Sequence, residues 1–138
     1  MDQQGVLDAL ARLALFSDLG RPQLEAVAHT MSEESFPAGQ RVLRQGFSGS
    51  GFYVILDGEV SVRVDGVDVA HLARGDFFGE ISLILGEPPI ADVVTITPLR
   101  ALLLAGPDLR GFLLTYPAVM YRMLQSVSRR LDRANRRS

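Results

Sequence analysis

The sequence predicts a mainly β domain, in which a barrel or sandwich of short strands is flanked by helices. Short β-branched segments punctuated by glycine fill residues 33–105, and many such strands at regular spacing are typical of sandwiches and barrels. Apolar residues follow a helical spacing instead in residues 1–32 and 107–136. We therefore expect a single domain over residues 1–138, with N-terminal helices, then the β-barrel, then C-terminal helices.

The composition bounds what this domain is expected to do. The chain has 138 residues, 47% of them hydrophobic, and no cysteine, which excludes a disulfide, a thiolate nucleophile and a cysteine-based zinc site. No apolar run reaches the ~18 residues that suggest a membrane span. The start, MDQQGVLDAL, lacks the basic and apolar regions of a signal peptide. We therefore expect a cytoplasmic protein that does not enter membranes.

Two helices are expected at the start of the chain. The stretch QGVLDALARLALF, residues 4–16, has apolar residues three and four positions apart, which predicts an amphipathic helix. Ser17 and Asp18 are suitable caps for a second helix over residues 21–31, with Pro22 in its first turn.

The central strands are predicted from alternation and from turn chemistry. In EVSVRVDG three valines alternate with polar residues, which indicates a strand with one buried face. Asp65-Gly66 predicts a tight hairpin, because a type I′ turn requires positive φ at both positions. RVLRQG, FYVILDG and VDVAHL have similar composition, and ADVVTIT and LRALLLAG give two more strands separated by Pro98.

Helical spacing returns after Gly106. PDLRGFLLTY predicts a short helix, and PAVMYRMLQSVSRRLDRANRR predicts a longer one. In the longer helix a stripe of apolar residues falls at intervals of four, namely Val119, Met123, Val127 and Leu131. Such a stripe is long enough to pack on the barrel and to meet a partner helix, and a helix docked only on its own barrel fits the pattern equally well.

Two segments carry a resemblance to a known family. RQGFSGSGFYVILDGEVSVRVDG and GDFFGEISLILGEPPIADV together resemble the cyclic nucleotide-binding domain family, as in the catabolite activator protein and the regulatory subunits of protein kinase A. The resemblance covers nearly the whole chain. It implies a β-barrel of the double-stranded β-helix or jelly-roll type with a long C-terminal helix. It also implies a regulatory role rather than an enzymatic one, with cyclic AMP or cyclic GMP as possible ligands.

The second segment resembles the phosphate-binding cassette of that family. By this resemblance the cassette contains Phe78, Gly79, Glu80, Ile81 and Ser82. A helix that begins at Glu80 points free backbone N–H groups at an anion. The resemblance implies that Glu80 accepts a hydrogen bond from the ribose 2′-hydroxyl. The alternative is that Glu80 only caps the short helix. The Ser82 hydroxyl can add one donor to the cradle.

The cassette departs from the family pattern at one position. The family has a segment of the form Pro-Arg-small-Ala, whereas this chain has Pro88-Pro89-Ile90-Ala91, so Pro89 stands where the Arg is expected. Charge-assisted hydrogen bonds to the phosphate contribute roughly 1.5–3 kcal/mol each, so losing a bidentate pair weakens binding by roughly two to four powers of ten. We expect cyclic nucleotide binding to be weak or lost, unless Arg74 or Arg100 from adjacent loops supplies the charge.

The long helix completes the site implied by the resemblance. Arg130 matches a family pattern near the nucleobase, and Ala134 and Asn135 fall where this helix touches the base, in some members from the partner subunit. The resemblance also implies a homodimer through this helix and leaves room for a regulatory partner protein or domain. We expect no helix-turn-helix domain of the family in this chain, and therefore no sequence-specific DNA binding.

Three functions remain open from the sequence. The first is a regulatory module with an atypical cassette, and the second is a functional cyclic AMP sensor with a substitute basic residue. The third is a non-specific nucleic-acid binder, because five of the last ten residues are arginine, although Arg136 and Arg137 fit a solvated helix end better.

Other motifs do not support an enzyme or a metal site. His29 and His71 have no neighbouring ligands in sequence, so no metal site is expected. GFSGSG lacks the lysine and the following helix of a P-loop. No nucleophile motif surrounds Ser17, Ser48, Ser50 or Ser126.

Overall fold

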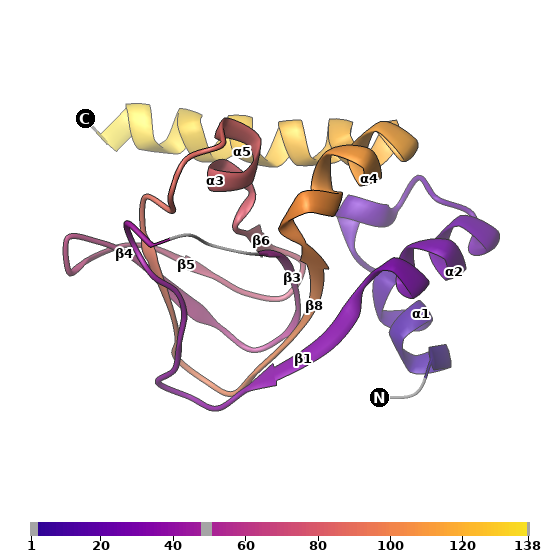
Figure 1. Cartoon of the computed structure of the whole chain (residues 1–138), viewed down its shortest axis with the longest axis horizontal. Helices are drawn as coiled ribbons and strands as arrows, with labels where there is room; N and C mark the ends of the chain where they lie inside the picture. Colours follow the sequence, from indigo (N-terminus) through magenta and orange to yellow (C-terminus); the bar gives the residue numbers. More distant parts are fainter. Residues whose placement is uncertain (1–2, 48–50, 138) are drawn as a thin grey trace.

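The computed structural model describes residues 3–47 and 51–137. Two four-stranded antiparallel sheets form the centre, with strand orders β1-β8-β3-β6 and β2-β7-β4-β5. The strands are β1 Ser32–Phe36, β2 Arg41–Leu43, β3 Gly51–Asp57, β4 Val60–Val64, β5 Val67–Leu72, β6 Phe77–Phe78, β7 Asp92–Thr95 and β8 Leu99–Ala105. Helices flank the sheets, as Figure 1 shows. This arrangement confirms the predicted fold class, with two facing sheets in place of one continuous barrel wall.

The predicted hairpin lies between β4 and β5. Asp65 and Gly66 have φ of 53° and 81°, the positive values that the turn requires. β6 is a two-residue strand that the sequence did not predict. It pairs antiparallel with β3, where Tyr53 lies opposite Phe78.

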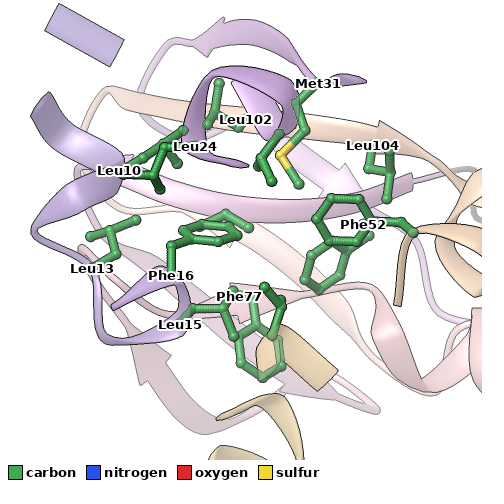
Figure 2. Packing of buried hydrophobic residues seen from close by; sticks show 14 of the residues in the cluster. Leu10, Leu13, Leu15, Phe16, Leu24, Met31, Phe52, Phe77, Leu102 and Leu104 are labelled. Carbon is green, nitrogen blue, oxygen red and sulfur yellow. The ribbon is translucent and has the colours of Figure 1, made fainter. Parts of the chain in front are cut away.

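Strand β3 lies between two hydrophobic cores, because its side chains alternate between the two faces of its sheet. Tyr53 and Ile55 face the other sheet, where they pack with residues of both sheets, such as Val60 of β4 and Leu99 of β8. Phe52, Val54 and Leu56 face the helices and pack with the larger cluster shown in Figure 2. This double burial explains why FYVILDG reads as a continuous apolar run rather than as an alternating one.

The N-terminal helices differ in detail from the prediction. The expected helix over residues 4–16 is divided into α1 Gln3–Ala11 and the 3₁₀ helix η1 Ala14–Phe16. The break occurs where the backbone N–H groups of Arg12 and Leu13 donate to carbonyls three residues earlier, which tightens the last turn.

The predicted caps of the second helix are wrong. Helix α2, Arg21–Thr30, has Gly20 at its N-cap, and the Gln23 side chain accepts a hydrogen bond from the Gly20 N–H at 3.2 Å. The Ser17 hydroxyl donates to the Ala14 carbonyl, and Asp18 accepts two hydrogen bonds from Arg122.

The C-terminal part contains η2 Gly106–Asp108, α4 Leu109–Thr115 and α5 Pro117–Arg137. Helix α5 runs along one side of the molecule, and the short helix α3, Glu80–Leu85, overlaps it in the view of Figure 1. None of the described helices is both long enough and apolar enough to cross a membrane.

The first part of the predicted apolar stripe of α5 docks on the chain's own core, whereas its last residue, Leu131, is exposed. Val119 is 0% exposed and Met123 is 3% exposed, and both belong to the larger cluster. They are therefore not available to a partner helix, which corrects that part of the prediction. The apolar residues that α5 presents to solvent are Met120, Tyr121, Leu124 and Leu131.

Candidate ligand-binding site

The turn into α3 is shaped by a glycine. Gly79 has φ of 95°, between β6 and the first residue of α3, Glu80. A Cβ atom at Gly79 would collide with the carbonyl oxygen of Gly51 in β3. Only glycine fits this position, because it needs both the left-handed backbone and the close approach of the neighbouring strand. The turn places Glu80 at the start of α3, where its buried side chain lines a cavity.

The cassette residues predicted from the sequence surround one cavity of about 100 Å³. Its lining includes all eight predicted positions of the cassette and the following segment, together with Arg130 of α5: Phe78, Gly79, Glu80, Ile81, Ser82, Pro89, Ile90, Ala91 and Arg130. Four apolar residues of the cavity wall were not predicted from the sequence, namely Leu43, Val62, Leu72 and Val93. Their only sequence signal is their position in the predicted strands.

Glu80 is the buried acid of this cavity. Its side chain is nearly inaccessible, and Oε1 accepts one hydrogen bond from Nη1 of Arg130 at 3.2 Å. The other carboxylate oxygen, Oε2, is buried without a hydrogen-bond partner among the described residues. Burial raises the pKa of Glu80, and the Arg130 charge offsets only part of that rise. The site therefore holds a carboxylate with one unused acceptor.

Arg130 closes the cavity from the side of α5. Its Nη2 donates to the Phe77 carbonyl at 2.9 Å, and its guanidinium carbon lies 4.5 Å from the centroid of the Phe77 ring. Together with the Glu80 contact, these interactions fix the guanidinium by an ion pair, a backbone hydrogen bond and a cation–π contact. The guanidinium of Arg130 is therefore already paired with groups of the protein itself, Glu80 and Phe77.

On the expected phosphate side of the cavity, the described residues supply no cation. Pro89 is buried, and its carbonyl accepts a hydrogen bond from the Gly46 N–H at 2.8 Å. Ile90 lines the cavity with its side chain about half exposed. The Ser82 hydroxyl donates at 3.4 Å to the Gly79 carbonyl, so this donor is turned toward its own helix.

The proposed replacement arginines lie elsewhere. Arg74 and Arg100 line a different cavity of about 450 Å³, together with Asp57 and residues of α1. Arg100 also pairs with Glu33 at 2.7 Å across the β1–β8 ladder. Neither arginine lines the Glu80 cavity, so the structure does not support the alternative in which one of them supplies the missing charge.

The remaining predicted site residues stay outside the cavity. Ala134 and Asn135 are exposed on α5, one turn beyond Arg130, and do not line the Glu80 cavity. The serines Ser48 and Ser50, which belong to GFSGSG, lie outside the described residues.

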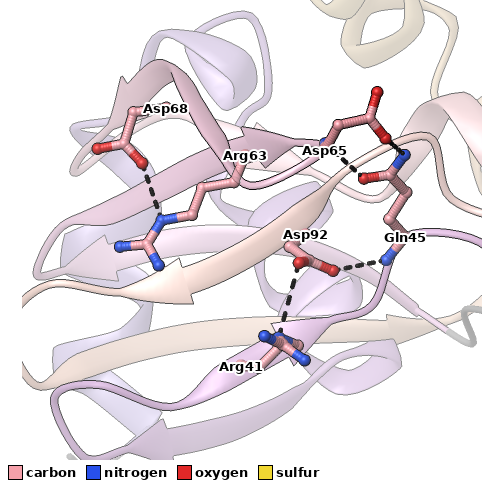
Figure 3. Close-up of polar contacts among 6 residues, drawn as sticks. All are labelled: Arg41, Gln45, Arg63, Asp65, Asp68 and Asp92. Atoms are coloured by element: carbon pink, nitrogen blue, oxygen red, sulfur yellow. Dashed lines mark hydrogen bonds and ion pairs between the residues drawn. The ribbon is translucent and has the colours of Figure 1, made fainter.

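A polar framework holds the loop after β2 beside the cavity. Asp92 accepts a hydrogen bond from the Gln45 N–H at 2.7 Å and lies 3.7 Å from Arg41 (Figure 3). The side chain of Gln45 exchanges two hydrogen bonds with Asp65 of the β4–β5 hairpin. These contacts connect β2, the hairpin and β7. They also position the backbone at Gly46, whose N–H donates to the Pro89 carbonyl.

A second, apolar groove of about 630 Å³ runs between α3, α4 and α5. Its lining consists of leucine, isoleucine, methionine, valine, proline and glycine with Arg110 as one cation. The described residues give this groove no carboxylate or hydroxyl side chain to orient a polar ligand, so the chemistry of a site for a polar ligand lies at Glu80 rather than here.

The histidines have local roles. His29 hydrogen-bonds to Gln3 at 3.3 Å, and His71 lies 3.8 Å from Asp68, a residue that also accepts from Ser61 and Arg63. Over residues 3–47 and 51–137 there is no group of three or more His, Asp or Glu side chains that could hold a metal ion.

Comparison with known proteins identifies the family. Residues 33–116 match the model of the cyclic nucleotide-binding domain, so the chain belongs to this family. A curated relative is the CRP-like cAMP-activated global transcriptional regulator of Mycobacterium tuberculosis. It is 28% identical over 133 residues, which cover 93% of this chain and 59% of that regulator. The chain thus spans less than two thirds of this relative.

Two solved structures resemble this fold closely. A cyclic nucleotide-binding domain from Methylobacillus flagellatus has a TM-score of 0.81 at 26% identity, with 97% of this chain and 80% of that chain covered. The second is a regulatory subunit of a cAMP-independent protein kinase A from Trypanosoma brucei, with a TM-score of 0.76, 26% identity, and 89% and 46% coverage. It is a triple mutant bound to cAMP, in which a threonine and the next valine are replaced by arginine and alanine.

Proposed function

We propose that this chain is a regulatory, non-catalytic ligand-sensing domain whose ligand enters the Glu80 cavity, and that it binds cyclic nucleotides weakly. One observation carries the proposal: among the described residues that line the cavity, the single cation is Arg130, and Arg130 is already bound to Glu80 and to the Phe77 carbonyl. A cyclic phosphate would enter with its negative charge unpaired, which is costly in a partly buried site.

The mutant kinase subunit supports this reading. There, a variant that gained an arginine followed by an alanine is bound to cAMP. Here, Pro89-Ile90 stands where the family pattern has an arginine and a small residue. By analogy, this chain retains the fold of the family but lacks the arginine that would bind the phosphate.

Cyclic AMP affinity is the direct test. We expect the wild-type chain to bind cyclic AMP with a Kd of about 100 μM or weaker, which is roughly −5.5 kcal/mol. The double variant Pro89→Arg, Ile90→Ala should tighten binding at least about tenfold, because it restores charge, donor and room together. Calorimetry on both proteins measures the difference, and the gain should shrink in high salt if the new guanidinium is partly exposed.

A matched control uses the neighbouring proline. Pro88 is exposed and does not line the cavity, so Pro88→Arg adds the same charge at a site without access to the ligand. Its cyclic AMP affinity should equal that of the wild type. Sub-micromolar binding by the wild-type chain would overturn the proposal and favour the alternative of a functional cyclic AMP sensor with an unrecognised basic residue.

Ligand entry should move Arg130. The cavity of about 100 Å³ is smaller than the ~300 Å³ at which ligand pockets begin, so it must open to admit a nucleotide. Arg130 forms its wall and belongs to α5, which offers a physical route from the ligand to the position of this helix. We propose that α5 transmits the ligand-bound state to a partner.

We also propose that α5 forms a homodimer, through a face that shares Val127 and Leu131 with the predicted stripe but has Met120 and Leu124 in place of the buried Val119 and Met123. Met120, Leu124, Val127 and Leu131 recur at intervals of four, three and four, which is the spacing of a coiled-coil seam. Three of them are exposed, and the apolar groove between α3, α4 and α5 adjoins Met120 and Leu124. A second copy would cover this surface.

A further inference from the structure

The apolar groove between α3, α4 and α5 is hydrophobic from its base to its rim. Leu109, Leu113 and Met123 are buried in the larger core and also line the groove, so they form its base. Large apolar side chains that are exposed to solvent form its rim, namely Ile84, Leu85, Leu114, Met120 and Leu124. Exposed apolar side chains gathered in one place mark binding sites in soluble proteins.

The size of the groove suits a small ligand. Its volume of about 630 Å³ falls within the range of roughly 300–1,000 Å³ that is usual for ligand pockets. Met120 and Met123 line it from α5, and flexible methionine side chains adapt to irregular apolar ligands. The groove therefore has room for an apolar body of ligand size as it stands.

One cation lies at this apolar surface. Arg110 of α4 is exposed and is the single charged residue that lines the groove within the described chain. Arg100, Arg122 and Arg130 are each paired with a carboxylate, whereas no described residue forms a hydrogen bond or ion pair with the Arg110 guanidinium. A guanidinium with free donors pairs bidentately with one carboxylate.

We infer that this groove binds a free fatty acid, with the aliphatic chain along the apolar lining and the carboxylate paired with Arg110. The single cation matches one negative charge, whereas a phosphate monoester would bring nearly two. An aliphatic chain has no hydrogen-bonding group, so it needs no polar partner in the groove. The inference goes beyond the proposed function, because this groove shares no described lining residue with the Glu80 cavity.

A membrane surface and a second copy of the chain match the groove less well. Binding to an anionic membrane uses several cations around an apolar face, and Arg110 is alone among the described lining residues. A second copy would bring the same apolar rim and another Arg110, so its described groove residues would supply no carboxylate. The proposed dimer would therefore cover the rim at Met120 and Leu124 without pairing Arg110.

Calorimetry with decanoate, octanoate and decanol on the full chain tests the site. Decanoate should bind at least about threefold more tightly than octanoate, because two further methylenes contribute roughly tenfold when fully buried. Arg110→Ala should weaken decanoate binding at least about tenfold and leave decanol binding unchanged, since decanol has the same chain without the charge. Arg129→Ala removes an exposed arginine of α5 outside the groove, and this control should bind both ligands like the wild type.

A second variant tests the apolar lining while Arg110 stays in place. Ile84→Glu puts a negative charge on an exposed residue of the rim, so the protein should stay folded and lose decanoate affinity at least about tenfold. Val67→Glu makes a similar change at an exposed residue of β5 outside the groove, and its decanoate affinity should equal that of the wild type. Thermal unfolding shows that both variants are folded.

Several results would overturn the inference. Unchanged decanoate affinity in Arg110→Ala, or an equal loss for decanoate and decanol, would contradict the ion pair. Decanoate affinity that falls as the chain concentration rises would assign the groove to a second copy. Failure to bind monomeric decanoate at millimolar concentration would exclude the site, and binding to phosphatidylglycerol vesicles in that case would assign the groove to a membrane surface. All of these results are independent of cyclic AMP binding, which tests the proposed function separately.

Discussion

Glu80 illustrates at the scale of one residue how a binding group lowers the stability of its own fold. Its pKa is raised by burial, so the folded chain holds the proton to a higher pH than the unfolded chain, whose Glu has a pKa near 4.5. Above the raised pKa the ionised carboxylate disfavours the folded state. Stability due to this group is therefore present at low pH and is lost as the pH rises from about 4.5 through the raised pKa.

Replacement of Glu80 with Gln should therefore stabilise the protein at neutral pH. The variant cannot ionise, so its Tm should exceed that of the wild type by a few degrees at pH 7, at about 4 °C per kcal/mol for a domain of this size. The difference in Tm between the variant and the wild type should become smaller as the pH falls toward 4.5. Thermal unfolding across this pH range measures the effect, with Glu87→Gln as an exposed control in the same segment. A variant that is less stable at pH 7 would indicate that the Arg130 contact dominates.

Helix α3 depends on two glycines with left-handed backbone, one at each end. Gly79 and Gly86 have φ of 95° and 69°, and they differ in their surroundings. A Cβ on Gly79 would meet the backbone of Gly51, whereas a Cβ on Gly86 would meet no atom within 4 Å. The first glycine is needed for both conformation and space, and the second for conformation alone.

This difference predicts two distinct losses of stability. Gly86→Ala should lower the free energy of unfolding by about 1–2 kcal/mol, the cost of a left-handed backbone for alanine. Gly79→Ala should lower it by more than about 3 kcal/mol, because β3 and the turn must also separate. Denaturant unfolding of the two variants compares them directly. Equal losses would mean that the turn shifts without strain to admit the methyl group.

Helix α5 presents two apolar faces, and two methionines distinguish them. Met123 is buried in the chain's own core, whereas Met120 is 39% exposed beside the apolar groove. Met120→Glu should convert the proposed dimer to a folded monomer, with monomer stability changed by about 0.5 kcal/mol or less. Met123→Glu should instead lower stability by about 3–5 kcal/mol, because it buries a charge without a partner. Sedimentation and thermal unfolding measure the two outcomes. A wild-type monomer at high micromolar concentration would contradict the dimer.

At the scale of the whole molecule, the sequence predicted the fold and most of the cavity lining. Alternating valines and Asp65-Gly66 indicate strands and a hairpin through local rules, and the structure confirms them. The segment from Phe78 to Ala91 places its own residues around one cavity because a single turn and a short helix organise it.

Contacts between distant segments could not be predicted in this way. The apolar residues of α5 fall on two adjacent stripes of similar spacing, so periodicity alone does not tell which stripe meets the core. Arg130 reaches Glu80 across 50 positions, and Arg74 and Arg100 lie near the cassette in sequence but line another cavity. Only the packing of helices against sheets decides these positions.

N-terminal segments of the fold pair with C-terminal segments, and this affects how the chain folds while it is being synthesised. β1 pairs with β8, and Arg122 of α5 holds Asp18 from a position 104 residues later. At a translation rate of about 5–20 residues per second, the first helices leave the ribosome about 5–20 s before α5. During that interval Leu10 and Phe16, which are buried in the finished domain, have no partner from α5 or β8. The nascent chain therefore exposes an aggregation-prone apolar surface for seconds, and we expect a chaperone to protect it during synthesis. For the same reason, we expect refolding in vitro to require slow dilution.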